Sequence, residues 1–119
     1  MIVDDEEHIR RLYTEELTYE GYQIVTVSSG FNLFEKIARE KPHLVILDIK
    51  LIDYDGLELL QNIKKRIYDL PVGICTAYDT FKEDIRSVKA DFYVVRSFDL
   101  TELKNSIAST LNAYEKRQL

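Results

Sequence analysis

Cysteine, proline, glycine and tryptophan are all scarce in this sequence. Its 119 residues include one cysteine, two prolines, four glycines and no tryptophan. The lone cysteine, Cys75, excludes an intrachain disulfide and a zinc centre built on several thiolates. Because Cys75 lies within an apolar run, its predicted role is that of a small buried side chain. The sequence also contains no repeat, no low-complexity stretch and no linker.

Basic charge is in short supply as well. Acidic residues outnumber basic ones by 21 to 16, which gives a net charge of -5. A nucleic-acid-binding surface needs a basic face to displace counterions, so we expect no direct binding to nucleic acid. No apolar stretch approaches the ~18 residues of a membrane-spanning helix, and no charged-then-apolar leader precedes the fold. We therefore expect a cytoplasmic protein with no membrane partner.

Apolar residues, in contrast, are plentiful. They make up 45% of the sequence, enough for one core that buries roughly two-thirds of the surface of the unfolded chain. The length is that of one domain. We expect a single domain over residues 1–119, which either stands alone or is a piece of a longer protein.

Short apolar runs alternate with helical spacing along the chain. Runs rich in β-branched and aromatic residues, bounded by Gly, Pro or Asp, predict five strands: Met1–Val3, Tyr22–Val27, Leu44–Leu47, Val72–Cys75 and Phe92–Val95. Apolar residues three and four apart predict five helices: His8–Tyr19, Phe31–Glu40, Leu57–Arg66, Asp79–Lys89 and a last one that Asp99 begins. The Asp79–Lys89 prediction is the weakest, because only three of its residues are apolar. A marginal helix there is expected to be mobile.

This alternation predicts an α/β fold: a doubly wound, five-stranded parallel sheet with helices on both faces. Leu44–Leu47 contains no polar residue, as expected of a central strand buried on both sides. In such sheets, ligands bind beyond the carboxyl ends of the strands, near the point where the strand order reverses. The residues that directly follow each strand are therefore the first candidates for a functional site.

Polar residues follow four of the predicted strands. Asp4 and Asp5 follow the first, Asp48 the third, Thr76 the fourth and Arg96 the fifth. Crowded carboxylates repel one another unless a cation joins them, and oxygen ligands without His or Cys favour Mg²⁺ over Zn²⁺. A divalent ion also neutralises the charge that develops when a carboxylate attacks a phosphoryl group. Asp48 would be the attacking, covalent nucleophile.

Each of these residues also has an ordinary structural interpretation. Asp4 or Asp5 alone could cap a helix or a turn, and Thr76 alone could simply end a strand. Asp48 is harder to explain in this way, because it directly ends an apolar run that should be core. The combination of residues carries the functional prediction.

Four segments together resemble the receiver domains of two-component response regulators, over essentially the whole chain: Val3–Glu6, Asp48–Gly56, Thr76–Ala77 and Tyr93–Phe98. The resemblance implies a flavodoxin-like sheet with strand order 2-1-3-4-5. It also implies that Asp48 accepts a phosphoryl group from a sensor histidine kinase, in a Mg²⁺-dependent reaction. Such a chain is a phosphoacceptor rather than an enzyme, although it could catalyse its own phosphorylation and dephosphorylation.

The resemblance further implies a ligand set for Mg²⁺. Asp5 would bind the ion directly, and Asp4 would act mainly through a bound water. Asp48 and the backbone carbonyl of Lys50 would be the remaining protein ligands of the ion.

A switch is implied as well. Thr76 would turn its hydroxyl toward the phosphoryl oxygens, and the Tyr93 ring would change rotamer as Thr76 moves. Arg96 would pair with Asp48 and later with the phosphate. The surface over residues 79–114 would then bind a downstream effector protein or domain, with the chain a monomer or weak dimer.

The sequence departs from the family at several positions. Receivers usually carry Lys-Pro where this chain has Arg96-Ser97. Without the proline, the peptide bond before residue 97 is expected to be trans. The planar, forked guanidinium of arginine also replaces the ammonium of lysine. We hypothesise that phosphorylation survives but couples less strongly to the switch surface. Ile52 stands where Pro is common, and the segment between Thr76 and Arg96 is short. Tyr78 stands where the family tunes dephosphorylation.

Other functions stay open at this point. Arg96 supports a receiver-like interaction module that works without phosphorylation, although the set of aspartates counts against it. A Mg²⁺-dependent phosphatase would want a second acid where Lys50 stands. A flavin or nucleotide binder would need a Gly-rich loop after the first strand, where the sequence reads Asp4-Asp5-Glu6-Glu7.

Overall fold

The computed structural model describes residues 1–118 and has the predicted α/β architecture. Its elements in chain order are β1 (Ile2–Val3), α1 (Glu7–Tyr19), β2 (Thr26–Val27), α2 (Leu33–Glu40), β3 (Val45–Leu47), α3 (Gly56–Arg66), β4 (Val72–Thr76), the 3-10 helix η1 (Ile85–Lys89), β5 (Phe92–Val95) and α4 (Thr101–Gln118). The five strands are parallel, in the order β2-β1-β3-β4-β5. The predicted topology is therefore confirmed.

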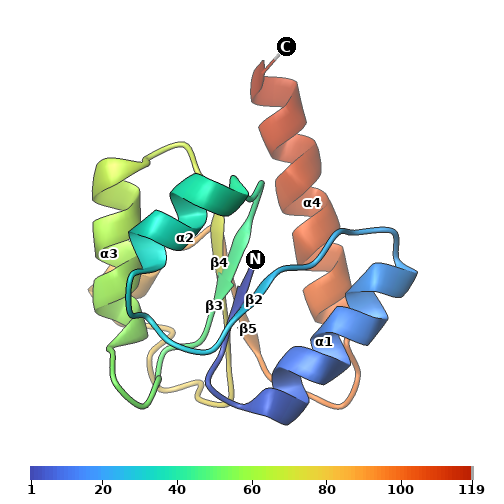
Figure 1. Cartoon of the computed structure of the whole chain (residues 1–119), viewed down its shortest axis with the longest axis horizontal. Coiled ribbons are helices and arrows are strands. Elements are labelled where there is room, and N and C mark those ends of the chain that lie inside the picture. Colours follow the sequence, from blue (N-terminus) through green and yellow to red (C-terminus); the bar gives the residue numbers. More distant parts are fainter. Residues whose placement is uncertain (119) are drawn as a thin grey trace.

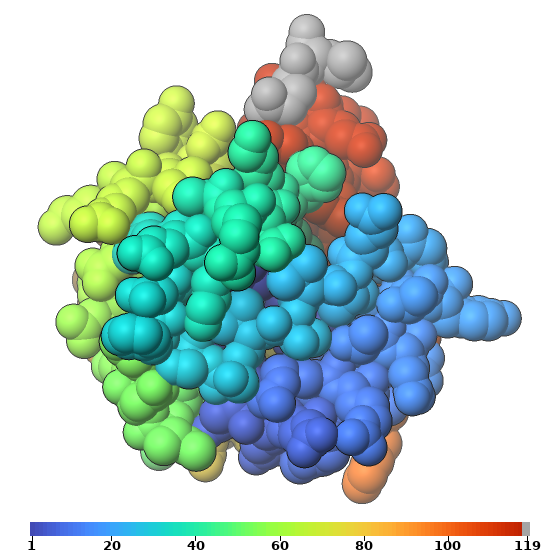
Figure 2. Space-filling view, viewed as in Figure 1, coloured from blue at the N-terminus to red at the C-terminus, as the bar shows by residue number. Residues whose placement is uncertain are grey.

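Helices cover both faces of the sheet. Figure 1 shows α1 and α4 on one side and α2 and α3 on the other. The space-filling view from the same direction shows α1, α2 and the segment between them hiding most of the sheet (Figure 2). Residues 1–118 contain no helix with the length and apolar character needed to cross a membrane.

Two apolar clusters form the core, because successive strand residues point to opposite faces of the sheet. In β3, Val45 and Leu47 pack with the cluster of α2 and α3, while Ile46 packs with the cluster of α1 and α4. The strand is thus buried on both sides, as its apolar sequence predicts. The helices on the two faces leave the carboxyl ends of the strands free to carry functional groups.

Some elements begin later than the sequence predicts. The strand β2 covers only Thr26–Val27, because its neighbour β1 offers only two residues to pair with. The helix α2 starts at Leu33 since Asn32 adopts a left-handed conformation, with φ 54°, that helices do not continue. At the start of α4, the Asp99 side chain accepts hydrogen bonds from Thr101.

The prediction of a helix over residues 79–89 is wrong. The segment forms turns and then the short 3-10 helix η1, so the described chain has four α-helices instead of the predicted five. Two of its three apolar residues, Ile85 and Val88, are 83% and 77% exposed, while Ser87 is buried. An α-helix here would have no apolar stripe to bury, and burial of such a stripe supplies most of the stability of a short helix.

Candidate functional site

Three aspartates meet at the carboxyl ends of β1 and β3. Val3 and Leu47 lie opposite each other in neighbouring strands, and the Asp48 N–H donates to the carbonyl of Val3 at 3.1 Å. The next residues, Asp4 and Asp48, therefore leave the sheet side by side. One oxygen from each of Asp4, Asp5 and Asp48 lies within 4.8 Å of the others.

Asp4 is buried and held by its neighbours. Its Oδ1 accepts the N–H of Glu6 at 2.9 Å, and its backbone carbonyl accepts from Arg10 Nη1 at 2.8 Å. Burial raises the pKa of the Asp4 carboxyl from 3.8 to about 6, although the hydrogen bond from Glu6 and the charge of Arg96 oppose the shift. The nearby charge of Asp48 raises that pKa further.

Asp48 is buried at the centre of the site. Its Oδ1 accepts the N–H of Ile49 at 2.8 Å, which leaves Oδ2 for other partners. The α3 helix begins directly behind it, and a Cβ atom on Gly56 would lie 2.0 Å from the Asp48 carbonyl oxygen. Glycine at position 56 therefore lets the chain pass close enough to fix the loop that carries Asp48.

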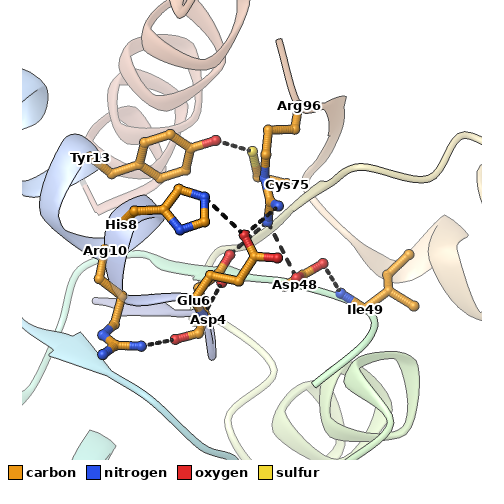
Figure 3. Close-up of polar contacts among 9 residues, drawn as sticks. All are labelled: Asp4, Glu6, His8, Arg10, Tyr13, Asp48, Ile49, Cys75 and Arg96. Atoms are coloured by element: carbon orange, nitrogen blue, oxygen red, sulfur yellow. Dashed lines mark hydrogen bonds and ion pairs between the residues drawn. The ribbon is translucent and has the colours of Figure 1, made fainter. Parts of the chain in front are cut away.

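Arg96 supplies a cation to the site. Its Nη2 lies 2.7 Å from Asp4 Oδ2 and 3.3 Å from Asp48 Oδ2, and its Nη1 lies 3.6 Å from Glu6 Oε2. Figure 3 shows the guanidinium reaching between these carboxylates. The expected pairing of Arg96 with Asp48 is present, but the shorter contact is with Asp4. The peptide bond to Ser97 is trans, as all peptide bonds are among residues 1–118.

Thr76 and Tyr93 lie on adjacent strands. Thr76 ends β4, is fully buried, and its Oγ1 has no hydrogen-bond partner among the described residues. A buried hydroxyl without a partner costs free energy, so this oxygen is suited to a group that arrives later. Tyr93 is half-buried on β5, and its hydroxyl donates to the backbone carbonyl of Tyr78 at 2.5 Å. The side chain thus reaches the loop that follows Thr76.

The side chain of Lys50 lies over two aromatic rings. Its Nζ is 4.6 Å from the centre of the Tyr78 ring and 5.6 Å from that of Phe81. These cation–π contacts join the loop after Asp48 to the loop after β4. Ile52, the residue that replaces the usual proline, is exposed.

Sequence reasoning placed Glu6 beside the aspartates without giving it a role, and it missed Arg10 and Tyr13 as neighbours of the site. Glu6 and Arg10 differ from other surface charges only in their contacts with Asp4 and Arg96. Tyr13 carried a usable signal: it belongs to the buried face of α1, and a buried tyrosine hydroxyl usually has a hydrogen-bond partner.

The residues present fit a Mg²⁺ ion. The donor set consists of oxygens alone, and the three carboxylates bring three negative charges that a single guanidinium only partly offsets. Hard oxygen ligands in this number suit Mg²⁺, which keeps several waters in its shell.

The sequence matches the family description of the response regulator receiver domain over residues 1–108. The chain belongs to this family. Among curated relatives, it is 35% identical over 118 residues to the probable transcriptional regulator ycf27 of Pyropia yezoensis, covering 98% of this chain and 48% of the relative. It thus spans about half the length of that protein. Sporulation initiation phosphotransferase F of Bacillus subtilis is 31% identical over 113 residues, which cover 93% of this chain and 91% of the relative.

Solved structures agree with this family. The response regulator TrrA of Thermotoga maritima, in complex with Mg²⁺-BeF, superimposes with a TM-score of 0.88 at 40% identity, covering 92% of this chain and 95% of TrrA. TrrA bound to the histidine kinase ThkA matches with a TM-score of 0.86, at 41% identity and the same coverage. A CheY-like receiver from Methanospirillum hungatei matches with a TM-score of 0.89 at 29% identity, covering 98% of this chain and 94% of that one.

Proposed function

We propose that this receiver domain accepts a phosphoryl group on Asp48 from a phosphohistidine of a sensor histidine kinase, in a Mg²⁺-dependent reaction. The observation that carries the proposal is the meeting of Asp4, Asp5 and Asp48 within 4.8 Å. Three carboxylates this close destabilise one another unless cations neutralise them. Arg96 offsets only part of their charge, so a purely structural role does not explain why they lie together. The relation to TrrA, whose structures include Mg²⁺-BeF and a histidine kinase, supports the same function.

In the proposed reaction, Asp48 Oδ2 attacks the phosphorus atom. The O–P bond forms as the P–N bond of the phosphohistidine breaks, and the electron pair of that bond returns to the histidine nitrogen. Asp4, Asp5, Asp48 and the Lys50 carbonyl would hold Mg²⁺. The ion, when bound, neutralises charge on the phosphoryl oxygens. Arg96 then turns to the phosphoryl group, and the Thr76 hydroxyl donates to one of its oxygens.

The consequence we propose is a change of the surface over residues 79–114. Thr76 moves toward the phosphoryl group, and the Tyr93 ring, which now reaches the Tyr78 carbonyl, follows it. A downstream effector protein or domain would read this surface. In this role residues 1–119 act as one receiver domain in the cytoplasm, and the chain is a phosphoacceptor rather than an enzyme that turns over a substrate.

A second function is favoured by one observation, the position of Arg96. Its Nη2 already contacts both Asp4 and Asp48, so a protein cation offsets part of the charge that Mg²⁺ would otherwise neutralise. A receiver-like module that binds partners without phosphorylation would have this arrangement at rest. The two functions differ in whether Asp48 can be labelled.

Labelling with acetyl phosphate and Mg²⁺ tests the proposal. Intact-mass spectrometry should detect one added phosphoryl group on the wild type and none on Asp48→Asn. Asp53→Asn is the matched control, because Asp53 is a nearby exposed carboxylate that accepts a hydrogen bond from Ser29. Labelling only in an Arg96→Lys variant would favour the second function, and labelling of Asp48→Asn would remove Asp48 as the acceptor.

A further inference from the structure

Arg96 also borders a buried polar pair that lies beneath the acidic site. Tyr13 on α1 is 2% exposed, and Cys75 near the end of β4 is 3% exposed. The Tyr13 hydroxyl and Cys75 Sγ lie 3.3 Å apart, within hydrogen-bond distance for sulfur. Figure 3 shows this pair beside the side chain of Arg96. It joins α1 to β4 across 62 residues of sequence.

One nitrogen of Arg96 lacks an acceptor. The Nη2 atom bonds to Asp4 and Asp48, and Nη1 lies near Glu6. The Nε atom is buried and has no hydrogen-bond partner among the described residues. A buried N–H without an acceptor is destabilising. This state of Arg96 therefore leaves one donor that a different side-chain position could satisfy.

Figure 3 places the Arg96 side chain beside the pair, and the electrostatics of the pair agree with this position. Burial raises the pKa of Tyr13 and of Cys75, and in both groups the positive charge of Arg96 opposes that rise. A hydroxyl oxygen can donate one hydrogen bond and accept two more. If Tyr13 donates to Cys75 Sγ, its oxygen keeps lone pairs available to Arg96.

We propose that Tyr13 is a positioning residue for Arg96: its hydroxyl, oriented by Cys75, accepts the Arg96 Nε–H once the guanidinium leaves Asp4 for the phosphoryl group. The inference rests on the proposed function. It accounts for an arginine at this position, since the lysine side chain has no N–H within its stem and could donate only from its terminal Nζ.

The test is a double-mutant cycle between Tyr13→Phe and Arg96→Lys. Tyr13→Phe removes one oxygen and keeps the ring in the core. With Arg96 present, it should slow Asp48 labelling by acetyl phosphate about fivefold, in line with the loss of one hydrogen bond. In the Arg96→Lys background, the same change should have no effect on the labelling rate. Cys75→Val, which removes the sulfur partner of the hydroxyl, should act in the same direction and more weakly.

Nuclear magnetic resonance gives a second measurement, which does not depend on the rate of Asp48 labelling. The Arg96 Nε–H signal is assigned by its absence in Arg96→Lys. When Mg²⁺ and beryllofluoride are added, this signal should shift and exchange more slowly with water in the wild type. In Tyr13→Phe it should keep its fast exchange, because the acceptor is gone.

Two results would overturn the inference while leaving the proposed function intact. In one, the wild type is labelled and Tyr13→Phe slows labelling equally with Arg96 present and in the Arg96→Lys background, which indicates core packing alone. In the other, the Arg96 Nε–H signal responds to beryllofluoride equally in wild type and Tyr13→Phe. A wild type that takes up no label would instead end the proposed function, and this inference with it.

Discussion

The two halves of the sheet edge differ in how they are held. Where β1 and β3 end, backbone hydrogen bonds and the close approach of Gly56 fix the loop around Asp48. After β4, the backbone hydrogen bonds of residues 79–89 form short-range turns within the segment. Side chains add to them: Arg86 pairs with Asp84 and with Asp55 at the start of α3, and Ser87 Oγ donates to the Phe81 carbonyl. Apolar burial there comes from Phe81, which packs against the core, while Ile85 and Val88 of η1 are exposed.

In the proposed function, the region around Asp48 carries out the chemistry and residues 79–89 belong to the signalling surface. In the proposed function Asp48 is the nucleophile, and a nucleophile must be placed precisely against the atom that it attacks. We therefore expect the loop around Asp48 to be rigid. A surface that changes with phosphorylation needs two arrangements close in free energy, and such elements come from the least stable parts of a fold. The predictions below test whether the two regions differ in this way.

The largest effect is expected from Gly56→Ala, in the rigid region. The new Cβ would lie 2.0 Å from the Asp48 carbonyl oxygen and 2.7 Å from Ile49 Cα, both backbone atoms that cannot move aside. The free energy of unfolding should fall by about 3 kcal/mol, measured by urea denaturation. Asp48 labelling should fall with it.

Gly73→Ala is the matched control for that change. Its Cβ would meet the ring of Phe92 at 2.0 Å, a half-buried side chain that can rotate away. A loss of about 1 kcal/mol is expected. Equal losses in the two variants would show that the Asp48 loop is no more rigid than the rest of the sheet.

The next effect concerns pH and Mg²⁺. Burial raises the pKa of Asp4 from 3.8 to about 6, so without metal its contribution to stability is complete below pH 3.8 and is lost as the pH rises through 6. Mg²⁺ must displace that proton at low pH. Its affinity should be about tenfold weaker at pH 5 than at pH 7, measured by a fluorescence titration of the tyrosines.

Asp4→Asn provides the control for this pH dependence. The amide does not titrate, so Mg²⁺ binding should be weaker at every pH and nearly constant between pH 5 and pH 7. A wild-type affinity that does not change over this range, but exceeds that of Asp4→Asn, would mean that Asp4 binds the ion and is already ionised at pH 5; equal affinities in the two proteins would mean that Asp4 takes no part in binding.

A somewhat smaller effect is expected from Arg96→Met. The change removes a cation that lies 2.7 Å from Asp4 and 3.3 Å from Asp48. Mg²⁺ affinity at low ionic strength should rise about fivefold, and added salt should reduce the gain. Arg96→Lys keeps the charge and should bind Mg²⁺ much as the wild type does. Unchanged affinity in Arg96→Met would show that the guanidinium does not compete with the ion.

The rigid region could be predicted from the sequence for a physical reason. Asp4 and Asp48 each directly follow a short apolar run, and parallel strands place their carboxyl ends at one edge. Once the strands were assigned, the meeting of these carboxylates followed without knowledge of any side-chain contact. The oxygen-only ligand set followed from residue types alone.

The remaining features depend on contacts that local patterns do not encode. The Tyr13–Cys75 pair forms only because α1 packs over β4, and no spacing in the sequence announces it. Arg96 is far from both Asp4 and Asp48 in the sequence, and no local pattern indicates that its shorter contact is with Asp4. Residues 79–89 have enough apolar positions for a helical pattern but too few to bury one, and a balance this close is decided by tertiary packing.

The smallest effect is expected from Arg86→Met, in the loosely held region. The change removes the contacts of Arg86 Nη1 with Asp55 and of Nη2 with Asp84. Asp55 also caps α3, where its Oδ1 accepts the N–H of Leu57, so Arg86 ties η1 to the start of that helix. Exposed ion pairs contribute little to global stability. Amide hydrogen exchange in Ile85–Lys89 should therefore speed up only about two- to threefold.

The comparison between the two regions depends on where that exchange changes. If residues 79–89 open independently, the amides of β4 should keep their protection in Arg86→Met, because their hydrogen bonds to β3 and β5 do not involve the segment. Arg39→Met, which breaks the exposed pair with Glu40 on α2, should change neither region. Faster exchange of β4 in Arg86→Met would mean that the segment and the sheet open as one unit. A loosely held switch beside a rigid site would then be the wrong description, since movement at residues 79–89 would disturb Thr76 even in the absence of phosphate.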